Sequence, residues 1–159
     1  MSGQHPSKSG DHDVLSARRR WMAVLARAPA DRLWAILDSL PEKPRYKMLR
    51  PPEVGAVMVE ARAGGSGRRF NLGEATATRC TVRLADGTAG VSYALGRDVR
   101  RAEAAAVIDA LLQQGASGAE LMRNSIEPLA AAQAEARDIA SRKAAATKVD
   151  FFTMVRGEG

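Results

Sequence analysis

The stretch RRFNLGEATATRCTVRLADGTAGVSYAL, from Arg68 to Leu95, decides the fold of this chain. Apolar and polar residues alternate on both sides of an Asp86-Gly87 pair, a dipeptide typical of two-residue hairpin turns. The alternating apolar residues are Cys80, Val82, Leu84, Val91, Tyr93 and Leu95. A second alternating run lies at 57–62, and 46–50 is a candidate edge strand. The pattern predicts a central antiparallel sheet of three to five strands.

Helical patterns precede this sheet. From Asp13 onward Leu15, Met22 and Leu25 recur near helical spacing with Trp21 beside them. This pattern predicts a first helix with Trp21 in the core, on the stripe with Met22 and Leu25. Pro29 interrupts the pattern, and a second short helix is expected to run to about Leu40.

Further helical patterns follow the sheet. Asp98 is the expected N-cap of a helix that ends near Gly115. Ser117 and Glu120 have the spacing of a capping box, which predicts the start of the next helix. The alanine-rich segment at 130–147 favours helix strongly but has few large apolar residues to anchor it.

The chain is therefore predicted to have an α+β fold with helices before and after the sheet. At 159 residues it is long enough for one domain. We expect a disordered leader at 1–12, a single α+β domain at 13–148 and a C-terminal docking tail at 149–159.

The composition limits the chemistry that the chain can perform. Both histidines, His5 and His12, lie in the expected leader, and Cys80 is the single cysteine. We therefore expect no catalytic residue and no metal ligand set in the folded part. The sequence has no long apolar run, so no membrane span and a cytoplasmic location are expected. Cys80 is predicted to be a small buried hydrophobe and not a reactive thiol.

The net charge of +6 permits anionic partners, and 19 of the 24 basic residues are arginine. A glycine-rich loop followed by two arginines is one candidate phosphate site, because exposed backbone N–H groups bind anions. Arg97, beside the helix that Asp98 caps, is a second candidate. From the residues alone a simple turn with solvated arginines is the favoured interpretation of both. The candidate phosphate-binding residues are Gly64, Gly65, Gly67, Arg68, Arg69 and Arg97.

The basic run Arg18-Arg19-Arg20 is either a solvated helix face or a contact to an acidic partner. No motif of a known RNA- or DNA-binding fold accompanies it, so nucleic acid is not the expected ligand.

The C-terminus is rich in large apolar residues. Burying such side chains stabilises by roughly 1.5–3 kcal/mol each, so we expect this tail to dock either on its own core or on another chain. The residues predicted to make this interface are Phe151, Phe152, Met154, Val155 and Arg156.

Four stretches resemble the PhnG family of phosphonate metabolism. They are residues 18–33 with the Trp21-Met22 pair, 61–98 with the glycine loop and Gly96-Arg97-Asp98, 101–114, and VDFFTMVRG at 149–157. The resemblance implies a subunit of the bacterial carbon–phosphorus lyase core complex, with PhnH, PhnI and PhnJ-type partners and self-association within the complex as a further option.

The resemblance also implies the reaction. The complex transfers an alkylphosphonate to the ribose C1 of ATP and releases adenine, forming an α-D-ribose 1-phosphonate 5-triphosphate. The family implies an accessory role for this chain, no cofactor of its own, and an iron–sulfur cluster carried by another subunit. Two alternatives from other classes stay open: a basic nucleic-acid-binding module and a self-sufficient phosphotransferase or nucleosidase.

Overall fold

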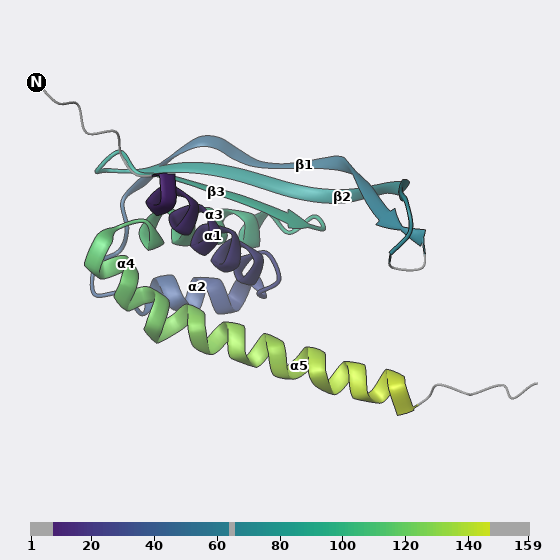
Figure 1. Ribbon diagram of the computed structural model, residues 1–159. Coiled ribbons are helices and arrows are strands. Elements are labelled where there is room, and N and C mark those ends of the chain that lie inside the picture. The colour runs from purple at the N-terminus through teal and green to yellow at the C-terminus, as the bar shows by residue number, and fades with distance from the viewer. Residues whose placement is uncertain (1–7, 64–65, 147–159) are drawn as a thin grey trace, which may run out of the picture.

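The computed structural model describes residues 8–63 and 66–146, which form a sheet with helices on one side (Figure 1). The elements follow one another along the chain as α1 Lys8–Leu25, α2 Ala30–Asp38, β1 Tyr46–Arg62, β2 Arg69–Leu84, β3 Ala89–Leu95, α3 Val99–Leu112, α4 Gly115–Leu121, the π-helical segment η2 Met122–Ile126, and α5 Glu127–Ala146. The predicted α+β class is confirmed.

The sheet has three antiparallel strands in the order β1-β2-β3. The predicted hairpin joins β2 to β3, and Gly87 has a φ of +93°, a left-handed conformation that glycine adopts without strain. The two predicted strands at 46–50 and 57–62 are parts of one long strand, β1. Pro51 and Pro52 are tolerated inside it because β1 is an edge strand and its register with β2 shifts at this point.

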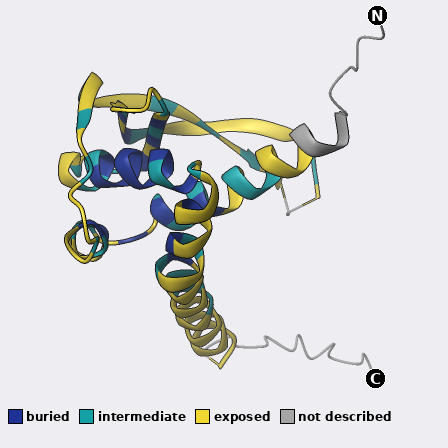
Figure 2. Cartoon of the chain, turned by 90° about the vertical axis from the view of Figure 1, so that its left-hand side faces the viewer, coloured by how far each residue is buried: buried dark blue, intermediate teal, exposed yellow. Residues whose placement is uncertain are grey.

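The core lies between the sheet and the helices, as the buried positions in Figure 2 show. Helix α3 packs under the middle of the sheet and is buried almost all around, which is why much of it is alanine. At Gly90 an added Cβ would lie 2.0 Å from the carbonyl oxygen of Ala106, so this strand and α3 approach more closely than any side chain permits. Trp21 and Leu25 are in the core, as predicted, whereas Leu15 of the same predicted stripe is 55% exposed.

Two local expectations were wrong, and the faces of β3 were not predicted. Helix α1 begins at Lys8, before the predicted start at Asp13. Ser117 does not cap a helix: it lies inside α4, and its hydroxyl donates to the carbonyl oxygen of Gln114, the residue that precedes that helix. On β3 the buried residues are Gly90, Ser92 and Ala94, so the larger residues at 91, 93 and 95 face away from the helices.

Helix α5 extends away from the rest of the described chain (Figures 1 and 2). None of its residues is buried, and Ile139 is 40% exposed. Its attachment includes a hydrogen bond from Gln133 Nε2 to the carbonyl oxygen of Val24, at 3.0 Å. Pro128 lacks an N–H, and the π-helical turn of η2 lies directly before it, where the regular helical hydrogen bonds are interrupted. The expected weak anchoring of this helix is confirmed.

Candidate functional site

The glycine loop lies at the tip of the β1–β2 hairpin. Gly64 and Gly65 fall outside the described residues. The N–H of Gly67 donates to the carbonyl oxygen of Ala63 at 2.8 Å, so this amide is used within the loop. Arg68 is exposed, and Arg69 Nη1 lies 3.6 Å from Glu60 Oε2 in an exposed ion pair. Such a pair is weak, so an anionic ligand can compete for Arg69.

Arg97 is exposed in the connection between β3 and α3. Asp98 caps α3, as predicted: its Oδ1 accepts from the N–H of Arg101 at 3.0 Å. The neighbouring backbone bonds to β2, because the N–H of Gly96 donates to the carbonyl oxygen of Thr76 at 2.8 Å. The capping carboxylate occupies the place where an anion would meet the end of the helix.

The structure does not bring the two candidate phosphate sites together. Gly96 is hydrogen-bonded to Thr76, whereas Arg69 begins β2 seven residues earlier. At about 3.3 Å per residue, Arg97 and Arg69 are roughly 20 Å apart along the strand. A single phosphate group does not reach both. The assignment of these residues to phosphate stays a prediction.

A buried carboxylate that the sequence reasoning missed holds α1 and the sheet to α3. Asp109 is fully buried, and its Oδ2 accepts from Arg18 Nη2 at 2.7 Å and from the N–H of Val91 at 2.9 Å. Its Oδ1 accepts from Trp21 Nε1 at 2.8 Å and from Arg18 Nε at 3.2 Å. The hydrogen bonds that Arg18 donates to Asp109 raise the pKa of Arg18. Arg18, whose side chain is 27% exposed, is therefore used to hold α1 to α3, contrary to the prediction that the whole basic run is a solvated face or a partner contact.

Tyr46, at the start of β1, and Cys80, on β2, lie on the helix side of the sheet. Burial raises the pKa of the Cys80 thiol to about 11, and the negative charge of Glu103 adds to the effect. Burial and a 2.7 Å hydrogen bond to Glu103 Oε1 raise the pKa of Tyr46 to about 12. Cys80 is 1% exposed, which confirms the prediction of a buried hydrophobe. Neither group is poised to react near neutral pH.

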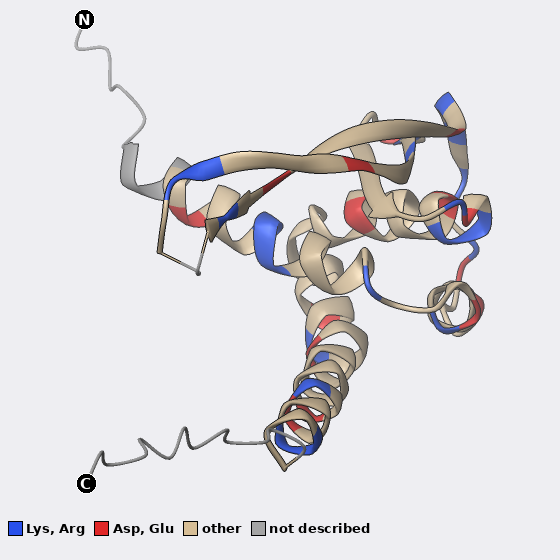
Figure 3. Ribbon diagram, turned by 90° about the vertical axis from the view of Figure 1, so that its right-hand side faces the viewer, with Lys and Arg blue, Asp and Glu red and all other residues tan. Residues whose placement is uncertain are grey.

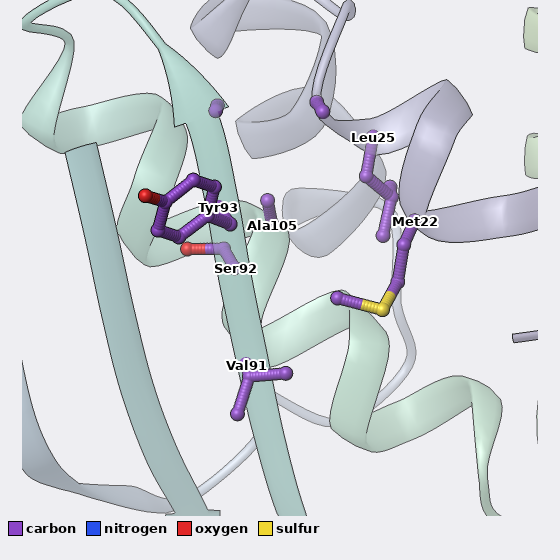
Figure 4. Close-up of a pocket in the computed structure, with 8 residues that line it drawn as sticks. Met22, Leu25, Val91, Ser92, Tyr93 and Ala105 are labelled. Carbon is purple, nitrogen blue, oxygen red and sulfur yellow. The ribbon is translucent and has the colours of Figure 1, made fainter. Parts of the chain in front are cut away.

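The cavities differ greatly in size. The one between α1 and β3 is lined by Met22, Leu25 and the residues around Tyr93 (Figure 4), and its volume of about 10 Å³ holds no more than about one water molecule. A wider groove of about 320 Å³ lies between α2 and the η2–α5 junction. The largest of these three, of about 1040 Å³, is an open depression beside the Asp86 turn and the α2–β1 connection.

Other features of the described residues bear on the class of site. No cluster of three or more histidine, cysteine, aspartate or glutamate residues suited to a metal ion is present in 8–63 and 66–146. Within the same ranges no helix is long and apolar enough to cross a membrane. The predicted interface residues Phe151, Phe152, Met154, Val155 and Arg156 lie outside the described residues.

Together these features define a small α+β protein whose sheet is covered by helices on one side and open on the other. The family model for the phosphonate metabolism protein PhnG matches residues 16–157. The chain is also 45% identical over 155 residues to the alpha-D-ribose 1-methylphosphonate 5-triphosphate synthase subunit PhnG of Rhizobium meliloti (strain 1021), covering 96% of this chain and 97% of that protein. The chain belongs to the PhnG family.

Proposed function

We propose that this chain is an accessory subunit of α-D-ribose 1-methylphosphonate 5-triphosphate synthase, the cytoplasmic complex that transfers an alkylphosphonate to the ribose C1 of ATP and releases adenine. The observation that carries the proposal is the 45% identity to a protein named as a subunit of this synthase, over nearly the full length of both chains. Identity at this level over a whole domain favours the same place in the same assembly.

The chain's contribution is to assembly and substrate positioning. The hydrogen bonds among the described residues support this role, because the buried polar groups are used to hold the fold together. Asp109 joins α1, α3 and β3, and Glu103 binds Tyr46 across the sheet–helix interface. Cys80 is a protonated, buried thiol. Catalytic groups are supplied by other subunits.

The proposed partners are PhnH, PhnI and PhnJ-type subunits. The complex consumes ATP, and an iron–sulfur cluster resides on another subunit. The apolar tail at 149–156 supplies one contact to these partners, because its large apolar side chains stabilise a contact only when they are buried away from water.

Co-purification tests the proposal. The tagged full-length chain is co-expressed with the three candidate partners, and the eluted proteins are identified by mass spectrometry. Recovery of a stoichiometric complex is the expected result. A chain that elutes alone, and that by itself releases adenine from ATP and methylphosphonate, would instead be a self-sufficient enzyme. Micromolar binding to DNA or RNA with a steep salt dependence would favour a nucleic-acid-binding module.

The arginines at the hairpin tip allow a test of the phosphate contact. Replacing both Arg68 and Arg69 by alanine is expected to leave the complex assembled but to lower adenine release, with a raised KM for ATP, because two cations near the triphosphate are lost. The double replacement of the exposed Arg19 and Arg20 by alanine is the matched control. Equal kinetics for the two double variants would remove the hairpin tip from the substrate site.

A further inference from the structure

The side of the sheet opposite the helices is uncovered by any described element (Figure 1). We call this side the outer face. Residues paired across antiparallel strands point to the same side, so the register defines its rows. From one end to the other the rows are Lys47–Arg83–Ala89, Arg50–Thr81–Val91, Glu53–Arg79–Tyr93, Gly55–Ala77–Leu95, Val57–Ala75, Val59–Gly73 and Ala61–Phe70.

The first three rows form a basic end. Arg79 Nη2 lies 3.1 Å from Glu53 Oε2, and Arg50 Nη1 lies 4.0 Å from the same oxygen, so two arginines share one carboxylate. Lys47 and Arg83 are directly opposite each other, and neither makes an ion pair within the described part of the chain. Like charges in opposite positions repel and destabilise a sheet. The isolated chain therefore retains a repulsion that an acidic surface would relieve.

The remaining rows form an apolar end. Leu95 is 63% exposed and Phe70 is 46% exposed, and the rows between them carry no charge, although their small residues are less exposed and Ala77 is only 4% exposed. Tyr93, which is 51% exposed, lies at the border with the basic end. In Figure 3 the middle of the β1–β2 ribbon is mostly uncharged, whereas both of its ends carry lysine or arginine positions. At the hairpin end the pair next to Ala61–Phe70 is Arg62–Arg69.

The outer face has the dimensions of a substantial part of an interface. Strand β2 from Phe70 to Arg83 extends over roughly 40 Å, and two to three strands give a width of roughly 10–15 Å. The resulting area is on the order of 500 Å², compared with about 800 Å² contributed by each partner in a typical stable complex. Two strands that project past β3 without a helix under them are also marginal in water on their own.

We propose that the outer face is the docking surface for another protein subunit, one that presents an apolar patch to Tyr93 and Leu95 and acidic side chains to Lys47 and Arg83. This inference rests on the proposed function, because it specifies a surface through which the subunit assembles. A second copy of this chain fits poorly, since two basic ends would repel. A nucleic acid would match the cations but leave Leu95 and its apolar neighbours in water.

Two variants with matched controls test the docking surface. Arg83→Glu places a carboxylate opposite Lys47 and is compared with Arg27→Glu at an exposed position just after α1. Leu95→Ser is compared with Leu15→Ser, because Leu15 is an exposed leucine on α1. Each full-length chain is titrated against the partner subunits recovered in the co-purification experiment. We expect Kd to rise on the order of tenfold or more for the two outer-face variants, and by less than about twofold for the controls, which remove surface contacts of small effect.

The stability of the isolated chains separates docking from folding. Arg83→Glu replaces a repulsive pair by an attractive one, so its Tm is expected to equal or exceed that of the wild type. Weaker binding together with a clearly lower Tm of both outer-face variants would overturn the proposal, as would unchanged binding.

The same variants distinguish the other occupants. Sedimentation that shows a dimer lost in Leu95→Ser would assign the face to a second copy. Binding to a 20-nucleotide single-stranded DNA that is lost in Arg83→Glu would assign it to nucleic acid. Either result would contradict the proposal. A wild-type chain that binds no partner subunit would refute the proposed function itself, whereas partner binding that ignores all four variants refutes only the outer face.

Discussion

At the scale of single residues, Asp109 connects more elements than any surface ion pair among the described residues. Its carboxylate accepts hydrogen bonds from the side chains of Arg18 and Trp21 on α1 and from a backbone N–H on β3. The N–H of Val91 would otherwise be an unpaired donor on an edge strand. Because the carboxylate is fully buried, the loss of one acceptor leaves a donor without a partner, which is more unfavourable than the loss of the bond alone.

Asp109→Asn tests this arrangement. The amide keeps the size but turns an acceptor into a donor, and the charge partner of Arg18 disappears. We expect the free energy of unfolding to fall by about 2–4 kcal/mol in denaturant titrations, with little change in the slope. Asp138→Asn on the exposed α5 is the control and should change it by less than about 0.5 kcal/mol. Equal stability of the two variants would show that the network is dispensable.

The pKa of Cys80 makes a prediction about alkaline pH. The folded protein holds the thiol protonated up to about pH 11, whereas the unfolded chain begins to lose the proton near its ordinary value of 9.0. The stabilisation is complete below pH 9 and is lost as the pH rises from 9 to 11. The free energy of unfolding of the wild type should therefore fall more steeply over this range than that of Cys80→Ala. Tyr46 titrates in both proteins, so parallel curves would mean that the thiol does not contribute.

The sequence surroundings of the two aspartates explain why the role of Asp98 as a helix cap was predicted and the role of Asp109 was not. Asp98 precedes a helical pattern directly, and local spacing is enough to assign a cap. Asp109 lies inside the apolar run of α3, and its partners are about 90 residues away in the sequence. The available signal was a lone carboxylate in a buried helix, together with Arg18 and Trp21 three residues apart on one helix face.

At the scale of elements, alternation and turn chemistry were sufficient for the sheet, because both are local properties. They did not assign the faces of β3. Its larger residues at 91, 93 and 95 resemble a core stripe, yet α3 approaches so closely that only the small residues Gly90, Ser92 and Ala94 fit beneath the strand. Packing distance between elements is a tertiary property, and periodicity does not contain it. The merger of two predicted strands into β1 has the same origin, since only the edge position makes Pro51 and Pro52 acceptable.

Gly90 provides the test at this scale. An added methyl group would meet the backbone and side chain of α3 at 2.0–2.7 Å, so Gly90→Ala should separate β3 from α3 and lower the free energy of unfolding by about 1–3 kcal/mol. Gly55→Ala on β1 is the matched control, because nothing lies within 4 Å of its added Cβ. Chemical denaturation of both variants checks the prediction, and it fails if Gly90→Ala is as stable as the control.

At the scale of the whole molecule, the described chain has a compact body and two features that bury little surface against it. Helix α5 has no buried residue, and the outer face exposes apolar and unpaired basic side chains together. The sequence indicated a weakly anchored helix followed by an apolar tail. It did not indicate the outer face, because that surface arises only when the register of three strands is known.

Deletion of residues 149–159 separates folding from assembly. We expect the truncated chain to melt within about 2 °C of the full-length protein, since small local changes shift Tm by only a few degrees, but to lose most of its recovery in the complex. Differential scanning calorimetry and co-purification measure the two effects. A large drop in Tm with normal assembly would show that the tail packs on its own domain.

The most direct measurement of the central claim is adenine release from ATP and methylphosphonate in three mixtures. These contain this chain alone, the partner subunits alone, and all subunits together. If the chain acts only as part of the assembly, adenine appears at a substantial rate in the complete mixture and at background rates in the other two. Full activity of the partners without this chain, or of this chain without its partners, would contradict the account.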